Sequence, residues 1–446
     1  MKQPEFTTEF IKYLTKSVTP FHAVEQMAGL LADRGFHCLS DGDSWDKLGP
    51  GSYFLIHNDS SLVAFQLAAG EPAREGFRMV AAHTDSPSLR IHPRPVRIVH
   101  SFLQLGVEVY GGALLAPWFD RDLSIAGRVV WHEEEQLHRG LIDFKRPVAI
   151  IPSLAIHLDR EANKKRSIKK HKDIIPVLMQ VDGDEEVDFG AILTRQIRQR
   201  YRQSDTPRVL DFDLFLYDTQ PPALTGLRQE FITGGRLDNL ISCFTALFAL
   251  PHADAVCRNT LLILNDHEEV GSVSASGAQG ELLKSVLHRL LPHPETRRRC
   301  LSRSLLLSAD NAHGLHPGAT DKFDINHTPL LNRGIVIKTN ANQRYATSGI
   351  TAAIFRSICR NIGVPVQDFV MRADMACGST IGPITAAKIG VAAVDIGVPT
   401  LGMHSIRETA GITDCYSLYR VFGEFFGLQT ESPEMELLQE NSRLDT

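Results

Sequence analysis

The sequence turns from apolar to acidic at Leu261-Leu262-Ile263-Leu264-Asn265-Asp266-His267-Glu268-Glu269-Val270-Gly271-Ser272. The apolar run is typical of a buried strand, so Glu268 and Glu269 lie just past a strand's C-terminal end, where active sites collect in open α/β sheets. Neighbouring carboxylates repel each other, and burying both is costly without a cation. The pair therefore favours a metal site in which one Glu binds the ion and the other takes a proton from a bound water. A Glu-Glu pair on a solvated turn is also common, so the other candidate ligands have to decide.

The length and composition limit the classes of protein. A chain of 446 residues predicts two domains, or one domain with a large insertion. The net charge of −5 gives no general attraction to nucleic acid or to an anionic membrane. No segment approaches the roughly 18 consecutive apolar residues of a membrane span, and the first residues lack the features of a signal peptide. The seven cysteines include no Cys-x-x-Cys pair, which favours reduced thiols in the cytoplasm.

The first part of the chain alternates helical and strand-like periodicity, at residues 6–16, 21–31, 52–56, 62–67 and 77–82. The last of these segments runs directly into His83-Thr84-Asp85. A histidine at a strand end can bind a metal, and Asp85 would then be a supporting or bridging carboxylate. The alternative is an ordinary histidine in a turn.

Residues 94–227 are β-rich, and we interpret them as a second domain inserted into the first. The region contains a basic run at residues 164–172. A solvated loop or helix face explains this run better than nucleic-acid binding does, because no interleaved aromatic residues accompany it. Apolar and polar side chains alternate at residues 154–158, which predicts a strand with His157 on its polar face.

The α/β pattern resumes at about residue 228 and brings three more candidate ligands. Asp238 precedes the apolar stretch 240–250, which predicts a buried helix, so Asp238 is either the N-cap of that helix or a ligand. Asp310 ends the apolar strand at residues 304–309, and His404 lies beyond a later strand.

The candidate ligands at element ends are His83, Asp238, Glu269, Asp310 and His404. Oxygen and imidazole donors without a thiolate suit a catalytic pair of Zn²⁺, Mn²⁺ or Co²⁺ ions. Two ions about 3.5–4 Å apart need a bridging carboxylate and about two further ligands each, which this set can supply. The sequence has no His-Glu-x-x-His motif, which disfavours a single-zinc protease with its ligands on one helix.

The sequence resembles the aspartyl aminopeptidases, which are metallopeptidases with two cocatalytic metals. The resemblance covers nearly the whole chain, from residue 19 to residue 408. It rests on the motifs Ala82-His83-Thr84-Asp85-Ser86-Pro87, Gly235-Arg236-Leu237-Asp238-Asn239, His267-Glu268-Glu269-Val270-Gly271-Ser272, Ser308-Ala309-Asp310-Asn311-Ala312-His313 and Met403-His404-Ser405.

The resemblance assigns roles to these residues. It implies two Zn²⁺ per subunit, with Mn²⁺ or Co²⁺ possible in one site, bound by His83, Asp238, Glu269, Asp310 and His404. Asp238 matches the bridge, Glu268 the general base, and Asp85 belongs to the catalytic group. Substrate-binding positions match His157, His313, Lys338 and Tyr345. The segment around His157 matches one that reaches into the neighbouring subunit's active site.

The implied fold is α/β: a mixed-sheet, zinc-exopeptidase-like catalytic domain at residues 1–93 and 228–446, with a β-rich dimerisation domain at 94–227. The implied activity removes N-terminal Asp or Glu from peptides, and the implied assembly is a homododecamer built from homodimers. Lys338 follows a strand and opens a polar loop. A buried cation there would offset the desolvation of an acidic substrate side chain, although a surface lysine is the simpler interpretation.

Two departures from the family's pattern stand out. Met375-Ala376 occupies a position where Ser-Pro is expected, and the basic run at 164–172 replaces an acidic or neutral loop. Two alternative functions remain: a related dinuclear deacylase or carboxypeptidase, and a non-catalytic, metal-stabilised assembly protein. Glu268 argues against the second, because a structural site has no use for an unligated carboxylate beside the metal.

Overall fold

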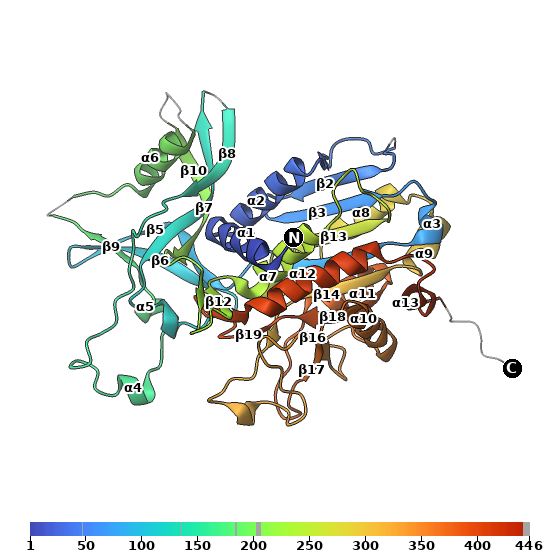
Figure 1. The fold of residues 1–446 in the computed structure, drawn as a ribbon. Helices are drawn as coiled ribbons and strands as arrows, with labels where there is room; N and C mark the ends of the chain where they lie inside the picture. The colour runs from blue at the N-terminus through green and yellow to red at the C-terminus, as the bar shows by residue number, and fades with distance from the viewer. Residues whose placement is uncertain (47, 135, 183–184, 202–206, 440–446) are drawn as a thin grey trace.

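The computed structural model describes residues 1–46, 48–134, 136–182, 185–201 and 207–439. Figure 1 shows a large α/β body and a smaller β-rich part, built from the middle of the chain, that extends from it. This mixed α/β architecture confirms the predicted fold class. Among the described residues, no helix is both long enough and apolar enough to cross a membrane.

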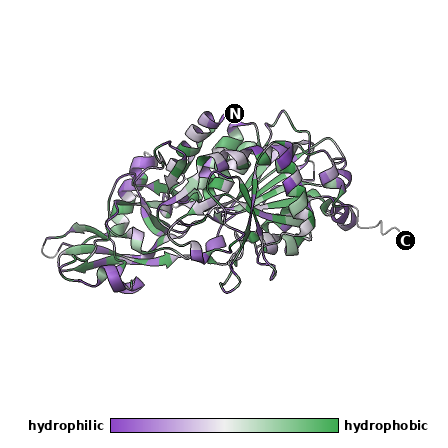
Figure 2. Ribbon diagram, turned by 60° about the horizontal axis from the view of Figure 1, so that its bottom comes forward, coloured by the Kyte–Doolittle hydropathy of each residue, from purple (hydrophilic) through white to green (hydrophobic). Residues whose placement is uncertain are grey.

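A nine-stranded mixed sheet forms the centre of the body, in the order β1-β2-β3-β13-β4-β14-β18-β16-β17. Its central strands β13, β4, β14 and β18 are parallel, as expected for apolar strands that are buried on both faces. Figure 2 shows them as a hydrophobic layer between helices. The strands are β1 (His37–Cys38), β2 (Gly51–His57), β3 (Ser61–Leu67), β4 (Arg78–His83), β13 (Thr260–Asn265), β14 (Leu305–Ala309), β16 (Ile335–Thr339), β17 (Val366–Val370) and β18 (Ala392–Gly397).

Helices cover both faces of this sheet. Alternate residues of β4 divide between the two cores, with Val80 and Ala82 in one and Met79 and Ala81 in the other. The first core also contains side chains of α1 (Gln3–Lys16), α2 (Pro20–Asp33), α7 (Leu237–Ala249), α10 (Gly349–Asn361), α12 (Ile412–Gly427) and α13 (Pro433–Glu436). The second contains side chains of α8 (Leu282–Leu290), α9 (Pro294–Leu301) and α11 (Ile381–Ile389), and the short α3 (Pro72–Glu75) packs near α9.

The β-rich part is a six-stranded antiparallel sheet in the order β8-β7-β10-β5-β6-β9. The helix α6 buries Phe189, Leu193 and Ile197 in the core of this part. The proposed domain boundaries near residues 94 and 227 lie within β5 and beyond β10. The elements are β5 (Ser88–Val99), β6 (Phe102–Tyr110), β7 (Leu123–Glu133), β8 (Gln136–Asp143), α4 (Ala162–Lys165), α5 (Lys170–Asp173), β9 (Val177–Gln180), α6 (Phe189–Tyr201) and β10 (Arg208–Asp218).

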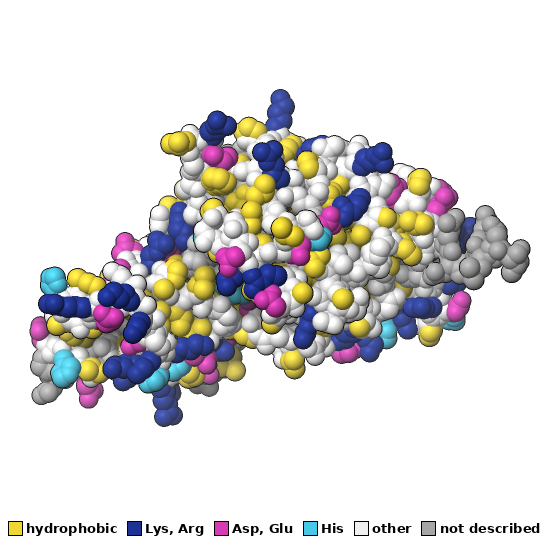
Figure 3. All heavy atoms as spheres, turned by 90° about the horizontal axis from the view of Figure 1, so that it is seen from below, with side chains coloured by type: hydrophobic (Ala, Val, Ile, Leu, Met, Phe, Trp, Pro, Cys, Tyr) yellow, Lys and Arg dark blue, Asp and Glu magenta, His cyan; other side chains and the backbone are white. Residues whose placement is uncertain are grey.

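The basic run at residues 164–172 lies on the surface of this part, in and between α4 and α5. Its lysines and arginine are all exposed, as expected for a solvated loop or helix face. Figure 3 shows Lys and Arg side chains gathered at the end of the molecule that the six-stranded sheet forms.

The segment at residues 154–158 forms no strand, so this prediction is wrong. Its backbone makes a turn, in which the Leu158 amide donates a hydrogen bond to the Ala155 carbonyl at 2.8 Å. Leu154 and Leu158 are 61% and 74% exposed, so these apolar side chains pack against no sheet in the described part of the chain. His157 is exposed on the same turn.

A five-stranded sheet, β11-β12-β20-β19-β15, lies beside the body. Gly234 at the end of β12 pairs with Glu408 at the start of β20, so this sheet brings the first turn of α7 beside the turn that precedes β20. The strands are β11 (Ala223–Thr225), β12 (Phe231–Gly234), β15 (Ala312–His313), β19 (Pro399–Leu401) and β20 (Glu408–Gly411).

Candidate metal centre

Three neighbouring strands of the nine-stranded sheet deliver candidate side chains to one edge. β4 ends at His83, which is in register with Asn265 of its parallel neighbour β13, just before Glu268 and Glu269. β14 runs parallel to β4 on the other side and ends immediately before Asp310. The carboxyl ends of parallel strands meet at one edge, so the sequence prediction of a site at strand ends agrees with the fold.

The five-stranded sheet delivers the two other candidate ligands. Asp238 lies in the first turn of α7, directly after β12, and His404 lies in the turn between β19 and β20. Arg236, not Asp238, occupies the N-cap of α7, so the interpretation of Asp238 as the N-cap is wrong. Oδ1 of Asp238 accepts no hydrogen bond from the described residues and is free for the cluster.

The five candidate ligands lie together, with Asp238 at their centre. The Nε2 atom of His83 is 3.6 Å from Asp238 Oδ1 and 3.5 Å from Asp310 Oδ1. The Nε2 atom of His404 is 3.5 Å from Asp238 Oδ2 and 3.3 Å from Glu269 Oε1. Each of these two groups of three has donor atoms within 4.8 Å of one another, and Asp238 belongs to both.

Both histidines are held with one ring nitrogen turned to the cluster. The Nδ1 atom of His83 is 3.0 Å from the Asp85 carbonyl, and that of His404 is 3.3 Å from the Gly112 carbonyl. A hydrogen bond at Nδ1 fixes the ring and leaves Nε2 as the ligand, which is the usual arrangement of metal-binding histidines.

Burial and mutual repulsion disfavour the charged forms of the glutamates. Burial, together with the charges of Asp310, Asp85 and Asp238, raises the pKa of Glu268 to about 7. Burial and Asp238 also raise the pKa of Glu269 well above its ordinary value. Desolvation also opposes the charged form of Asp310, but the charges of Lys338 and His83 lower the pKa of its carboxyl. A divalent cation would relieve this repulsion.

The donor set fits zinc. Asp238 Oδ1 is buried and accepts no hydrogen bond from the described residues, which leaves a lone pair for a cation. Imidazole and carboxylate ligands without thiolate are typical of catalytic zinc sites.

Asp85 fixes the backbone of Glu268 and Glu269 through hydrogen bonds. Its two carboxylate oxygens accept hydrogen bonds from the backbone amides of Glu268 and Glu269, at 3.1 and 3.0 Å. The hydroxyl of Tyr110, from the inserted sheet, donates to the same carboxylate at 2.8 Å. Although burial opposes it, contact with His83 lowers the pKa of Asp85, so its charged form is the one these donors hold.

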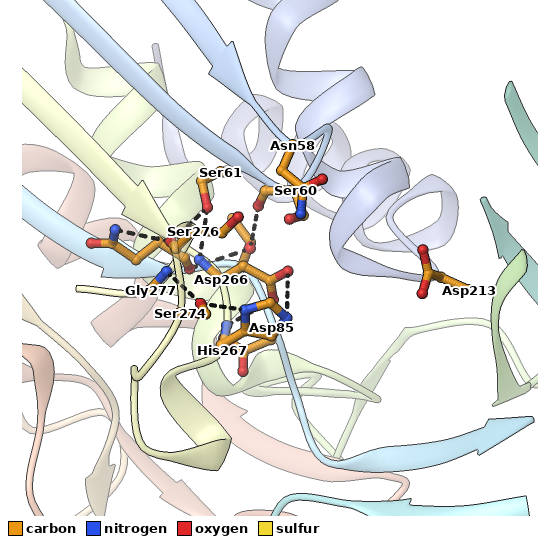
Figure 4. Close-up of polar contacts among 12 residues, drawn as sticks. Asn58, Ser60, Ser61, Asp85, Asp213, Asp266, His267, Ser274, Ser276 and Gly277 are labelled. Atoms are coloured by element: carbon orange, nitrogen blue, oxygen red, sulfur yellow. Dashed lines mark hydrogen bonds and ion pairs between the residues drawn. The ribbon is translucent and has the colours of Figure 1, made fainter. Parts of the chain in front are cut away.

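The loop that carries the glutamates is fixed by a polar network, shown in Figure 4. The Asp266 amide donates to Ser61 Oγ at 3.0 Å, and the Nδ1 atom of His267 is 2.7 Å from Ser274 Oγ. Ser274 Oγ also accepts from the Gly277 amide at 2.9 Å. These bonds attach both ends of the loop to neighbouring segments and limit the positions that the glutamate side chains can take.

A hollow of about 280 Å³, here called the catalytic hollow, opens beside the cluster. The predicted substrate-binding residues His313, Lys338 and Tyr345 line it together with the five ligand candidates and Glu268. Lys338 is only 2% exposed, and its Nζ lies 3.3 Å from Asp310 Oδ2 and 5.2 Å from the centre of the Tyr345 ring. His157, in contrast, is not among the residues of this chain that line the hollow.

Comparison with known proteins gives the family. Residues 13–426 match the model of the aminopeptidase I zinc metalloprotease family, M18. The chain is 53% identical over 419 residues to the "Probable M18 family aminopeptidase 2" of Pseudomonas putida strain F1, covering 94% of this chain and 97% of that protein. This chain belongs to the M18 aminopeptidases. It is therefore an aminopeptidase of the zinc metalloprotease class.

Solved structures agree with this assignment. The cryo-EM structure of the Ape4 and Nbr1 complex contains a chain with a TM-score of 0.90 and 37% identity, covering 94% of this chain and 85% of that one. The structure of the S. cerevesiae mApe1 dodecamer gives a TM-score of 0.85 at 27% identity, covering 98% of this chain and 99% of that one.

Two buried carboxylates of this M18 aminopeptidase were missed by the sequence reasoning. Glu408 accepts from the backbone amide of Asp238 at 2.9 Å and from that of His404 at 2.7 Å, so it fixes two ligand candidates relative to each other. Burial and the charge of Asp238 raise the pKa of Glu408 to about 8. Asp395 lies within the apolar strand β18. A single carboxylate inside an apolar strand is the sequence signal by which Asp395 could have been found.

Asp395 joins two walls of the catalytic hollow. It is fully buried and accepts hydrogen bonds from Ser308 Oγ at 2.7 Å, Thr380 Oγ1 at 2.6 Å and the Ala346 amide at 2.6 Å. Thr380 lines the hollow, and Ala346 directly follows Tyr345, which also lines it. Asp395 therefore positions residues that line the catalytic hollow without itself lining it.

Asp395→Asn should loosen these walls, because the amide offers an N–H to neighbours that all donate. Leaving buried donors unpaired costs about 1–3 kcal/mol, so we expect KM to rise roughly tenfold while zinc content is retained. Steady-state kinetics and elemental analysis measure both. Asp368→Asn, at an exposed ion pair with Arg356, is the control. Unchanged KM in Asp395→Asn would contradict the role.

Proposed function

We propose that this aminopeptidase removes N-terminal Asp or Glu from peptides. The observation that supports this specificity is Lys338, a buried cation in the wall of the catalytic hollow. An acidic side chain entering a buried site needs a cation to offset its desolvation. The ammonium group of Lys338 can donate three hydrogen bonds. Asp310 and the Asn311 carbonyl receive two of them, and the third is available to a substrate carboxylate.

The proposed centre binds two zinc ions per subunit through His83, Asp238, Glu269, Asp310 and His404, with Mn²⁺ or Co²⁺ possible in one position. Asp238 would bridge, since it belongs to both groups of ligand candidates. Bound zinc would polarise the scissile carbonyl and acidify water.

Glu268 is the proposed general base, and it would pass the proton to the leaving amine. A general base has to lie within reach of the water whose proton it takes, and Glu268 lines the catalytic hollow beside the five ligand candidates. Asp85 would serve catalysis indirectly, by fixing the backbone of Glu268 and Glu269. Burial and the charge of Lys338 lower the pKa of His313, so this ring is neutral and can donate one hydrogen bond to substrate.

We also propose that the chain forms homodimers that assemble into a homododecamer, and that it works in the cytoplasm. The solved structure of a dodecameric relative, mApe1, supports the assembly. The exposed apolar residues Leu154, Ile156 and Leu158 support a covered surface in the inserted part. All seven cysteines are free, which supports a reducing compartment.

Glu268→Gln tests the base. The substitution keeps the size of the side chain but removes its ability to accept a proton, and loss of a general base commonly costs about 10²–10⁴-fold. We expect kcat to fall by that amount with zinc content unchanged. Glu269→Gln is the matched control and should lose zinc. If Glu268→Gln loses zinc instead, the roles of the two glutamates are reversed.

Lys338→Met tests the specificity. Kinetics on aminoacyl amides of Asp, Glu, Leu and Ala and on blocked peptides should show cleavage of free acidic N-termini in the native enzyme. Lys338→Met should lose far more activity on Asp and Glu than on Leu or Ala. Lys12→Met removes a lysine from an exposed ion pair with Glu9 and is the control, and Arg344 is the next candidate if Lys338 fails. Because Lys338 contacts Asp310, zinc content has to be measured in parallel. Equal losses on every substrate would refute the assignment.

His157 is proposed to donate a hydrogen bond to the oxyanion in a partner subunit's site. Removing such a donor costs roughly 10²–10³-fold, so His157→Phe should lose most activity while keeping zinc and oligomeric size. Mixing inactive His157→Phe and Glu268→Gln subunits, after dissociation and reassembly, should restore part of the activity, because some sites then receive an intact base and an intact donor. A mixture that stays inactive although mixed oligomers form would rule out donation between subunits.

A further inference from the structure

A second hollow, of about 370 Å³, adjoins the catalytic hollow. Four residues line both of them, namely His313, Phe369, Met403 and His404. Two of the four are side chains of the site itself: His404 is a ligand candidate and His313 faces the substrate. The second hollow is therefore reached directly across the rim of the metal centre.

The two hollows differ in chemistry. Lys338, Tyr345 and the carboxylates of the metal centre line only the catalytic hollow. Large apolar side chains form one part of the wall of the second hollow: Phe323, Phe369, Met371, Met375, Leu401 and Met403. Unbranched, polarisable methionines adapt to varied apolar and aromatic partners. This part of the wall suits a large apolar side chain.

Met375 lines this hollow from a short turn that a hydrogen bond and an ion pair hold in place. Its amide donates to the Arg372 carbonyl at 2.9 Å, and the Arg372 guanidinium pairs with Asp374 at 2.6 Å. The Met375 residue is nevertheless 39% exposed, so part of its apolar surface is uncovered in the chain. This is also the position at which the sequence departs from the family's expected serine.

The direction of a bound peptide follows from these walls. With the first side chain of the substrate inside the catalytic hollow and the scissile carbonyl at the metal centre, the chain after the scissile bond has to leave over a rim of this hollow. The rim formed by Met403 and His404 leads into the second hollow. The next side chain of the peptide is the group placed to enter it.

We propose that the second hollow binds the side chain of the substrate's second residue, that it prefers aromatic and large aliphatic side chains, and that Met375 determines this preference. The proposal rests on the proposed aminopeptidase site but not on its acidic specificity. Lys322 and Arg372 also line the hollow, and no carboxylate is among the described residues that line it. A basic second residue is therefore the least favoured.

The test is release of the first amino acid from two tripeptide series, Asp-Xaa-Gly and Leu-Xaa-Gly, with Xaa as Ala, Leu, Phe or Lys. Filling an apolar pocket changes kcat/KM by roughly 10–200-fold. We expect Phe and Leu to exceed Ala by about tenfold or more in whichever series is cleaved, and Lys to be poorest. If the Leu series is cleaved as well as the Asp series, the acidic specificity fails, but the second-residue preference is still measured.

Met375→Ser should reduce the Phe-to-Ala ratio of kcat/KM several-fold, and Met375→Leu should restore it. Met179→Ser is the matched control, because Met179 is also 39% exposed but lies on β9 of the inserted sheet. A flat response to Xaa, or an unchanged ratio in Met375→Ser, overturns the proposal. A flat response combined with a changed oligomeric size in Met375→Ser would show that another subunit covers this hollow, which overturns it too.

Discussion

Repulsion between carboxylates at one edge of the nine-stranded sheet is the constraint on which this structure depends. Asp238 is buried there and Glu268, Glu269 and Asp310 are partly buried, and the buried Asp85 bonds to the backbone of the glutamate pair. Buried like charges cannot all remain ionised unless cations or directed hydrogen bonds compensate them. The two histidines and Lys338 compensate only part of this repulsion. The part that remains uncompensated raises, together with burial, the pKa values of Glu268 and Glu269. Zinc bound by the proposed ligands would complete the compensation.

The same constraint explains why the ligand candidates come from so many segments. A cluster of charges has to be held rigidly, because each ångström of separation changes the repulsion. Parallel strands deliver three of the segments without any flexible connection, and the five-stranded sheet delivers the other two. Glu408 then fixes Asp238 to His404, and Asp85 fixes the glutamate loop, each through backbone amides. The inserted sheet takes part as well, through Tyr110 and the Gly112 carbonyl, so it is part of the site's support.

The sequence allowed the strand-end ligands to be predicted because apolar runs that end in Asp, Glu or His combine two independent signals. The parallel pairing that brings those ends together follows from the burial of both faces of the strands. Asp395 and Glu408 escaped the sequence reasoning because a buried carboxylate that accepts from amides and hydroxyls leaves no periodic pattern. The turn at 154–158 was misread for a related reason. Exposed apolar residues alternate there as they would in a strand, and only the surrounding structure shows that no sheet lies beneath them. The second hollow could not be predicted at all, since its walls come from segments far apart in the chain.

Metal binding and stability are linked in such a centre. A ligand that binds only the folded state stabilises it by RT ln(1 + [L]/Kd), about 4 kcal/mol when the free ligand is 1,000 times its dissociation constant. Here a bound zinc ion would also reduce the repulsion between the carboxylates of the folded chain. Loss of zinc would restore that repulsion at the edge of the sheet where β13, β4 and β14 end. The cores on both faces of the sheet are continuous apolar clusters that do not include the ligand side chains. Zinc removal should therefore loosen the loops at the strand ends and leave the sheet and its helices folded. The loops that bear the ligands would depend on the metal, whereas the sheet depends on the two apolar cores.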